Sequence, residues 1–349
     1  MPSARRVLLL VVLLLGLGVT TGAGVGSANP APADRGPALS VPAATLARSL
    51  DCHGDLAART PVLLIPGTTL TPAEFRWNYV RAFTATGRPF CSVTLPQNAL
   101  GDIQVAAEYV VSAIRTMSDR AGGRRIDLLG HSQGGMIARW AFKFFPDTRS
   151  KVDDYVALAP SNRGTVDADL VCAPGVCPPS IWQQRQGSRF LTALNAGGET
   201  FPEVDYTVAF TIYDEIVVPN LDTPRGIPVD ATPPANSPLR GGGANVSNTS
   251  LQAVCGPTHL ADHFLVGTAD AVSYALAVDA FDHPGPANPA RIDRRVCLQP
   301  FQPGVNPLTF PTDFAGLVAS AGTALATGPF VPAEPALAPY ARSAAPAQR

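Results

Sequence analysis

The stretch IDLLGHSQGGMIARW, residues 126–140, sets a serine between an apolar run and a helical pattern. Residues 126–130 are apolar enough for a buried strand, and helical spacing of apolar residues follows. Residues 130–134 read Gly-His-Ser-Gln-Gly, a GxSxG pattern. Between a strand and a helix this pattern is typical of a nucleophile elbow, a tight turn that presents the serine hydroxyl at the edge of a sheet. The stretch therefore predicts Ser132 as a nucleophile, and the backbone N–H of Gln133 as a donor to developing negative charge.

Apolar, β-rich runs recur on both sides of this stretch. They cover residues 61–67, 88–96, 152–160 and 204–214. Helical periodicity lies between them, at residues 103–117 and 136–145. Short apolar strands separated by helices predict an α/β fold, with a mostly parallel sheet covered by helices on both faces. The Ala-rich residues 314–327 predict a helix near the C-terminus, which either lines an apolar opening or packs as an ordinary helix.

The first 28 residues have the pattern of an export signal. Two arginines precede the thirteen-residue apolar run Val7–Val19, and small residues with cleavage sites after Ala23 or Ala28 follow it. Thirteen residues are too few to span a hydrocarbon core of about 30 Å, so a cleaved signal peptide, residues 1–28, is favoured over a membrane anchor. The mature chain is therefore expected to be secreted into the extracellular medium.

The rest of the chain predicts one domain with long loops. A Pro/Ala-rich lead-in covers residues 29–43, and a single folded domain is expected over residues 44–349. Residues 219–244 and 283–312 are long irregular connections, which in a compact domain are functional or tied down. The formal net charge is −1, without the basic patch of a nucleic-acid binder, so nucleic acid is excluded as a partner.

Six cysteines indicate disulfides. An even number in an exported chain favours three bridges, although fifteen pairings are open on number alone. Metal binding is the competing interpretation, but no CxxC spacing accompanies the cysteines, so no metal site is expected. The six are Cys52, Cys91, Cys172, Cys177, Cys255 and Cys297.

A nucleophilic serine needs a histidine base and an acid that orients it. Of the five histidines, His259 and His263 lie downstream of the acid candidates, as the chain order Ser–Asp–His requires. Asp214 ends an apolar strand and is the preferred acid. Glu215 is expected to point elsewhere, and Asp262 is too close to its neighbour His263 to orient that ring. The residues alone leave the choice between the two histidines open.

A second oxyanion donor is expected in the loop after an early strand. Gly67 and Thr68 follow the apolar run of residues 61–65 and fit this place. A Pro-Gly-Thr sequence is equally typical of a plain turn.

From about Leu50 to Arg342, the chain resembles the secreted α/β-hydrolase lipases typified by Candida antarctica lipase B. Matching segments occur in the same order, among them LLIPGTT, QVAAEYVVSAI, SQGGMIARWAFKFFP, SIWQQRQGS, DEIVVP, LQAVCGP and ADHF. The resemblance implies a nucleophile, an acid, a base and an oxyanion pair. These are Ser132, Asp214, His263, and Thr68 with Gln133.

The resemblance also implies disulfides between Cys52 and Cys91 and between Cys255 and Cys297. Cys172 and Cys177 lie in the segment that corresponds to the family's mobile flap, about residues 161–182, and have no counterpart there. Their five-residue spacing suits a small loop and no other thiol remains, so they are expected to pair. The yeast lipase has tryptophan before its serine, in the alcohol-side pocket, where this chain has His131. The pocket therefore cannot be carried over from the family.

Together these features predict a secreted serine hydrolase of carboxylic esters, a triacylglycerol lipase-like monomer that acts through an acyl-enzyme. Ester or lipid substrate at a lipid–water interface is its expected partner, and no metal or organic cofactor is expected. A short-chain esterase or polyester depolymerase is the alternative, and acyl transfer to an alcohol is also open. A secreted binding protein that retains the hydrolase fold is the alternative outside enzymes.

Overall fold

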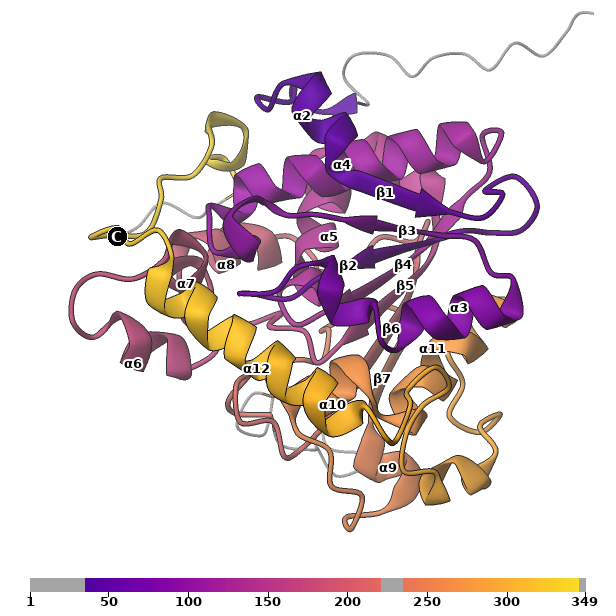
Figure 1. Ribbon diagram of the computed structural model, residues 1–349. Coiled ribbons are helices and arrows are strands. Elements are labelled where there is room, and N and C mark those ends of the chain that lie inside the picture. The colour runs from indigo at the N-terminus through magenta and orange to yellow at the C-terminus, as the bar shows by residue number, and fades with distance from the viewer. Residues whose placement is uncertain (1–34, 221–234, 345–349) are drawn as a thin grey trace, which may run out of the picture.

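The computed structural model describes residues 35–220 and 235–344 of the chain (Figure 1). The expected signal peptide, the first part of the lead-in and the middle of the connection 219–244 lie outside the described residues. Ser40 and Val41, in the last part of the expected lead-in, are held on the domain: the Glu108 carboxylate accepts from their N–H groups at 2.6 and 2.8 Å.

A seven-stranded sheet forms the centre of the domain, in the order β1-β3-β2-β4-β5-β6-β7 (Figure 1). The strands are β1 Leu50–His53, β2 Val62–Ile65, β3 Phe90–Val93, β4 Ile126–His131, β5 Val152–Leu158, β6 Asp205–Phe210 and β7 Val246–Ser250. Every neighbouring pair is parallel except β1 with β3. The predicted α/β class with a mostly parallel sheet is confirmed.

The five strands expected from the sequence all form, whereas β1 and β7 were not predicted. Both lie at the edges of the sheet. An edge strand is covered on fewer sides, so its sequence need not be apolar: β1 alternates between half-buried and exposed residues, and β7 reads VSNTS. Neither strand therefore has the continuous apolar run of a central parallel strand.

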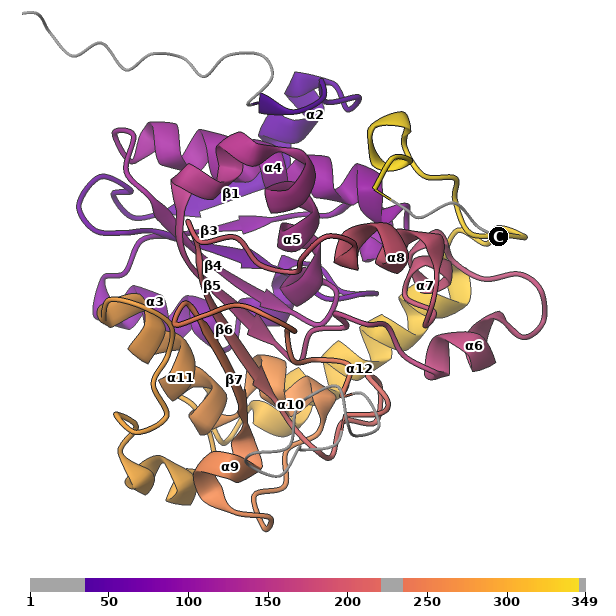
Figure 2. The same cartoon turned by 180° about the vertical axis from the view of Figure 1, so that it is seen from behind.

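Helices cover both faces of the sheet (Figures 1 and 2). One face carries α2 Ala43–Arg48, α4 Ile103–Arg120, α5 Gly134–Phe144 and α8 Arg189–Asn195, and the other carries α3 Tyr79–Thr86, α9 Leu251–Cys255 and α11 Ala271–Asp282. Side chains of β2 alternate between the two cores: Leu63 and Ile65 pack under α4 and α5, and Val62 and Leu64 under α3 and α11. This alternation explains why the strand is apolar throughout.

Four further helices lie around the carboxyl ends of the strands: α6 Asp167–Cys172, α7 Pro179–Gln183, α10 His263–Thr268 and α12 Phe310–Thr327 (Figure 1). Single 3₁₀ turns are η1 Pro72–Phe75, η2 Pro96–Ala99, η3 Pro146–Lys151, η4 Arg294–Leu298 and η5 Pro339–Ala341. The expected C-terminal helix is α12, which begins four residues earlier than predicted. Among the described residues, none of the helices has both the length and the apolar content needed to cross a membrane.

Three disulfides join the six cysteines. Cys52 on β1 bonds to Cys91 on β3, and Cys255 bonds to Cys297 across the loop before α12. The third bridge joins Cys172, the last residue of α6, to Cys177. These are the pairs expected from the sequence.

The residues after α12, numbers 329–344, form a C-terminal segment that returns to the first face of the sheet. The Tyr340 hydroxyl accepts a hydrogen bond of 3.2 Å from the indole N–H of Trp140 on α5. The Glu334 carboxylate accepts from the backbone N–H of Phe190, at the start of α8, at 2.8 Å. The segment therefore closes a part of the core that is built from residues far earlier in the chain.

Two buried carboxylates lie at the amino ends of β4 and β5. Asp127 and Asp154 are 1% and 5% exposed, and one oxygen of each has no hydrogen-bond partner among the described residues. Burial raises the pKa of Asp127 to about 8 and that of Asp154 to about 9. The half-exposed Asp153 completes a group of carboxylates whose oxygens lie within 4.8 Å of one another.

Candidate active site

The elbow at Ser132 is built by close backbone contacts. The φ angle of Ser132 is +55°, in the left-handed region that only a constrained turn imposes on a serine. Its N–H donates to the carbonyl of Leu158 at 2.8 Å. A Cβ atom on Gly130 would lie 2.1 Å from the Gly134 carbonyl oxygen, and one on Gly134 would lie 2.1 Å from that of Ile65. The glycines of the motif are therefore required by packing, because no side chain fits between these backbones.

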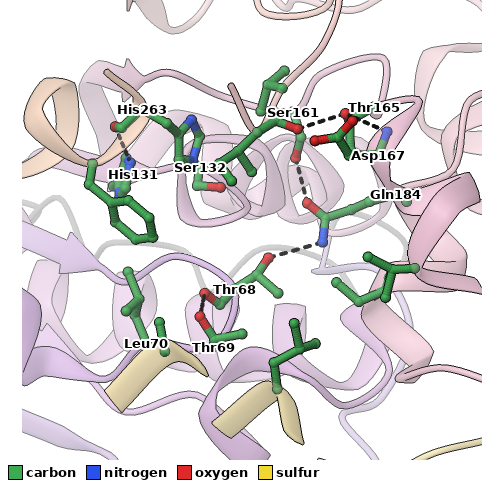
Figure 3. Close-up of a pocket in the computed structure, with 18 of the residues that line it drawn as sticks. Thr68, Thr69, Leu70, His131, Ser132, Ser161, Thr165, Asp167, Gln184 and His263 are labelled. Carbon is green, nitrogen blue, oxygen red and sulfur yellow. Dashed lines mark hydrogen bonds between the residues drawn. The ribbon is translucent and has the colours of Figure 1, made fainter. Parts of the chain in front are cut away.

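Asp214 and His263 come together beside this elbow. Asp214 lies in the loop after β6, and His263 is the first residue of α10. The imidazole Nδ1 is 3.0 Å from Asp214 Oδ2, and both side chains are buried. Ser132 and His263 line the same cavity, where Figure 3 shows them next to each other. A serine, a histidine and an aspartate, the residue types of a serine hydrolase, therefore lie at one cavity.

Charges around the pair favour the ionised forms of both groups. Burial of His263 disfavours the imidazolium and lowers its pKa. The Asp214 carboxylate acts against this and, with Glu215 and Glu74 adding to it, raises the pKa of His263 above its ordinary value. Burial likewise raises the pKa of Asp214, but His263 and two backbone N–H groups outweigh it and leave that pKa below its ordinary value. Asp214 is therefore ready to stabilise a protonated His263.

The loop after β2 meets the elbow at Thr68. Its hydroxyl donates to Gln133 Oε1 at 3.0 Å. It accepts from Gln184 Nε2 at 3.0 Å, as Figure 3 shows. The Ser161 hydroxyl donates to Gln184 Oε1 at 2.7 Å. The structure thus brings the expected oxyanion residues, Thr68 and Gln133, together. Gln184 was not singled out from the sequence, although its segment SIWQQRQGS is among those that resemble the family.

Glu215 also reaches His263, contrary to the expectation that it would point elsewhere. Its Oε2 accepts from the backbone N–H of His263 at 2.9 Å, so it contacts the backbone and not the ring. His259 lines a different pocket from Ser132, and its Nε2 is 2.5 Å from the Asp270 carboxylate. Asp262 caps α10 and accepts from Leu265 N–H at 2.8 Å. His263 is therefore the histidine that faces the serine.

A buried contact between His131 and Glu74 behind the elbow was not expected from the sequence. His131 Nδ1 bonds to Glu74 Oε1 in η1, and both residues are 0% exposed. The second Glu74 oxygen accepts from Gly67 N–H at 3.1 Å, and His131 Nε2 is 3.1 Å from the carbonyl oxygen of His263. Glu74 is 57 residues from His131 in the chain, and no motif marks it.

The cavity above Ser132 has a volume of about 340 Å³ and a largely apolar wall. Three residues of α12 line the cavity: Val318, Ala321 and Leu325. Of the two expectations for this helix, the one that it lines an apolar opening is therefore confirmed. Ala168 and Val171 of α6 form the opposite side of the wall. Polar groups gather on one side of the floor (Figure 3): Thr68, Ser161, Thr165, Asp167 and Gln184. Such a site suits a substrate with an apolar chain and one polar centre.

Among the residues that the structure describes, no cluster of potential metal ligands lies at the cavity. The described group of three carboxylates, at Asp127, Asp153 and Asp154, lies at the other end of the strands.

Comparisons with known proteins give relatives over most of the chain. Lipase B of Pseudozyma antarctica is 35% identical over 331 residues, which cover 89% of this chain and 88% of that protein. Aspergillus fumigatus lipase B has a crystal structure that matches with a TM-score of 0.79 at 31% identity, over 89% of this chain and 74% of that one. A family model described as Lipase (class 2) matches residues 59–226. A triacylglycerol lipase of Vibrio cholerae is 26% identical over 47% of this chain and 54% of its own length.

Proposed function

The chain belongs to the lipase B family of α/β-hydrolases and is a carboxylic ester hydrolase, and from this premise we propose that Ser132, His263 and Asp214 are its catalytic triad. The observation that carries the assignment is the 3.0 Å contact between His263 and Asp214, both buried, beside a serine on a strained elbow. This geometry supplies what a weak hydroxyl nucleophile needs, a base held in one orientation by an acid.

In the proposed mechanism Ser132 Oγ attacks the ester carbonyl as His263 takes its proton. Thr68 and Gln133 stabilise the tetrahedral oxyanion. The protonated His263, stabilised by Asp214, then gives its proton to the leaving alcohol. Water repeats the cycle on the acyl-enzyme and releases the acid.

The substrates we propose are lipid esters, with triacylglycerol as the reference substrate. The apolar cavity wall supports this, as do exposed apolar side chains in its lining, among them Val171 on α6, 39% exposed, and Val318 on α12, 43% exposed. Apolar groups that face solvent around a cavity suit contact with a lipid surface. The Vibrio cholerae relative named as a triacylglycerol lipase agrees with this choice. A short-chain esterase or polyester depolymerase would use the same triad.

We further propose that the protein is secreted as a monomer, with residues 1–28 removed and a single hydrolase domain over residues 44–349. Three disulfides support an oxidising compartment.

The test is hydrolysis of an ester series from two-carbon to eighteen-carbon acyl chains by the purified mature protein, with Ser132→Ala alongside. We expect turnover that falls by about 10⁶-fold in the variant, since removal of a triad serine has an effect of that order. An optimum at long chains supports the lipase, and an optimum at short chains supports the esterase. Turnover that persists in Ser132→Ala would overturn the triad.

A disulfide and hydrogen bonds to the C-terminal segment hold the proposed flap, residues 161–182, in place. Cys172 bonds to Cys177, whose backbone exchanges two hydrogen bonds of 3.2 and 3.0 Å with Val331 in the C-terminal segment. Trp182 Nε1 donates to the same Val331 carbonyl at 3.0 Å. We propose that these ties limit flap movement and with it interfacial activation. Turnover of a partly soluble ester should rise smoothly through its solubility limit. A sharp jump in turnover at the solubility limit would contradict this proposal. The double variant Cys172→Ser/Cys177→Ser, which lacks the bridge, is expected to show such a jump.

A further inference from the structure

Glu74 and His131 lie directly behind the proposed catalytic histidine, and the proposed mechanism does not use them. Both are fully buried and bonded to each other. Each also bonds to the backbone of a different active-site loop: Glu74 to the N–H of Gly67, next to Thr68, and His131 to the carbonyl of His263. The pair thus forms a continuous chain of hydrogen bonds from the oxyanion loop to the base.

The partners of His131 fix where its protons lie. The His263 carbonyl only accepts, so Nε2 of His131 must carry a hydrogen. Nδ1 faces a carboxylate oxygen. The pair is therefore either an imidazolium with a carboxylate or a neutral imidazole with a carboxylic acid, and in both cases its net charge is zero. A neutral pair can be buried completely, whereas a lone carboxylate at this place would be costly.

The structure makes room for the His131 ring on α10. A Cβ atom on Gly267 would lie 2.3 Å from Cγ of that ring, so only glycine fits at this position. Gly267 is four residues after His263, one turn along the same helix. The ring centroid of His131 is 4.8 Å from that of His263. The helix α10, which begins with His263, therefore packs closely against the His131 ring.

We propose that Glu74 and His131 are positioning residues, which fix the backbone of the base His263 relative to the oxyanion loop at Gly67 and Thr68. The inference rests on the proposed function, because it assigns these two loops their roles. The described hydrogen bonds of the Glu74 and His131 side chains go to each other and to backbone groups, and none goes to Ser132 or to the His263 ring. Their effect is on geometry, and a displacement of about 1 Å in an active site can cost about 10²-fold in rate.

The first test compares two variants that keep the volume of the site. In Glu74→Gln, the amide oxygen still accepts from Gly67 and the amide N–H donates to Nδ1 of a neutral His131, so the chain of hydrogen bonds survives. In Glu74→Gln with His131→Phe, a ring still fills the space beside Gly267, but the bond to the His263 carbonyl is lost. Both variants replace the buried carboxyl group by the same amide, so the comparison isolates the bond from His131 to the His263 carbonyl.

We expect Glu74→Gln to keep kcat within about threefold of the unmodified protein, and the double variant to lose about 30-fold in kcat with KM within twofold, in line with the cost of misplacement. The substrates are ethyl and hexyl butyrate, which share an acyl group and differ in alcohol length. An equal loss on both esters supports positioning. A loss confined to the longer alcohol would show that His131 only shapes the alcohol pocket, and would overturn the proposal.

A matched control is available in the second histidine–carboxylate pair, His259 with Asp270. His259→Phe with Asp270→Asn makes the same chemical change outside the cavity. We expect it to lower the melting temperature about as much as the double variant while leaving kcat unchanged. If both double variants lose kcat equally, the loss comes from general destabilisation and the proposal is overturned.

Failure of the inference is distinguishable from failure of the proposed function. If the unmodified protein has no turnover that depends on Ser132, the triad is wrong. If that turnover is present and the Glu74→Gln/His131→Phe variant, folded by circular dichroism, retains full kcat, the triad stands and the positioning role is wrong.

Discussion

The two ends of strand β4 bury acidic groups in opposite electrostatic settings. At the amino end, Asp127 lies beside Asp154 of β5, and burial raises the pKa values of the two to about 8 and about 9. At the carboxyl end, Glu74 faces His131, and the nearby Asp214 faces His263. There the pKa of Asp214 falls below its ordinary value.

The difference shows that partners, and not burial, decide the charge of a carboxylate in this sheet. Each carboxylate at the carboxyl end has an imidazole and at least one backbone N–H facing it. Asp127 and Asp154 have no imidazole, and each keeps an oxygen without a partner among the described residues. At neutral pH, we therefore expect protons at the amino end and an ionised Asp214 at the carboxyl end, beside His263.

Removal of the charge at Asp214 should have the largest effect. Asp214→Asn keeps the shape but lets His263 adopt the wrong tautomer, so we expect kcat to fall by about 10⁴-fold. Steady-state hydrolysis of a soluble ester measures this. Asp169→Asn, on α6 and in an exposed ion pair with Arg185, is the control and should be unchanged. A loss below tenfold in Asp214→Asn would break the contrast between the two ends.

The hydroxyl of Thr68 should have the next largest effect. Thr68→Val removes the group that links Gln133 and Gln184, and loss of one oxyanion-hole donor costs about 10²-fold in kcat. Thr68→Ser retains the hydroxyl and should recover most of the rate. If KM rises in Thr68→Val and kcat does not change, the residue binds the ground state and not the oxyanion.

The acidic limb of the pH profile tests the raised pKa of His263. The base must be neutral, so kcat/KM should fall about tenfold per pH unit once the pH drops below that pKa. Because the pKa is raised, the limb should lie above the ordinary value of about 6.5. In Asp214→Asn the residual activity should show its limb at lower pH. A limb below 6.5 in the unmodified protein would contradict the charge pattern.

The amino end should affect stability and not rate. Between the ordinary pKa of an aspartate, about 4, and the folded value of about 9, the folded protein holds a proton at Asp154 that the unfolded chain has lost. Stability therefore falls as the pH rises through this window. Asp154→Asn removes the part of this dependence that comes from Asp154, so we expect a melting temperature about 3–6 °C above that of the unmodified protein at pH 9 and a smaller gain at pH 5.

The control for this change is Asp153→Asn. The Asp153 side chain is 51% exposed, so this substitution should shift the melting temperature little. If Asp154→Asn is instead less stable than the unmodified protein at pH 9, a positive charge compensates the carboxylates. The electrostatic contrast between the two ends of β4 would then be wrong.

The sequence was informative where one residue type is required at one place, and less so where distant groups meet. The GxSxG elbow, the acid at a strand end and the buried strands follow local rules of backbone and burial. The edge strands β1 and β7 carry too little apolar character to be found that way. Glu74 and Gln184 reach the site through contacts with residues 57 and 116 positions away, and single-sequence patterns carry no signal over such separations.

The C-terminal segment has a consequence for how the chain reaches its fold. Trp140 on α5 and Gln104 on α4 receive their last partners, Tyr340 and the backbone N–H of Ala338, only from the end of the polypeptide. Contacts of such long sequence separation form slowly, because a large loop must close first. A growing or unfolded chain therefore exposes the outer surface of α4 and α5 until residues 335–344 are available. Loss of residues 335–344 should accordingly appear first as aggregation during refolding, with the triad itself intact.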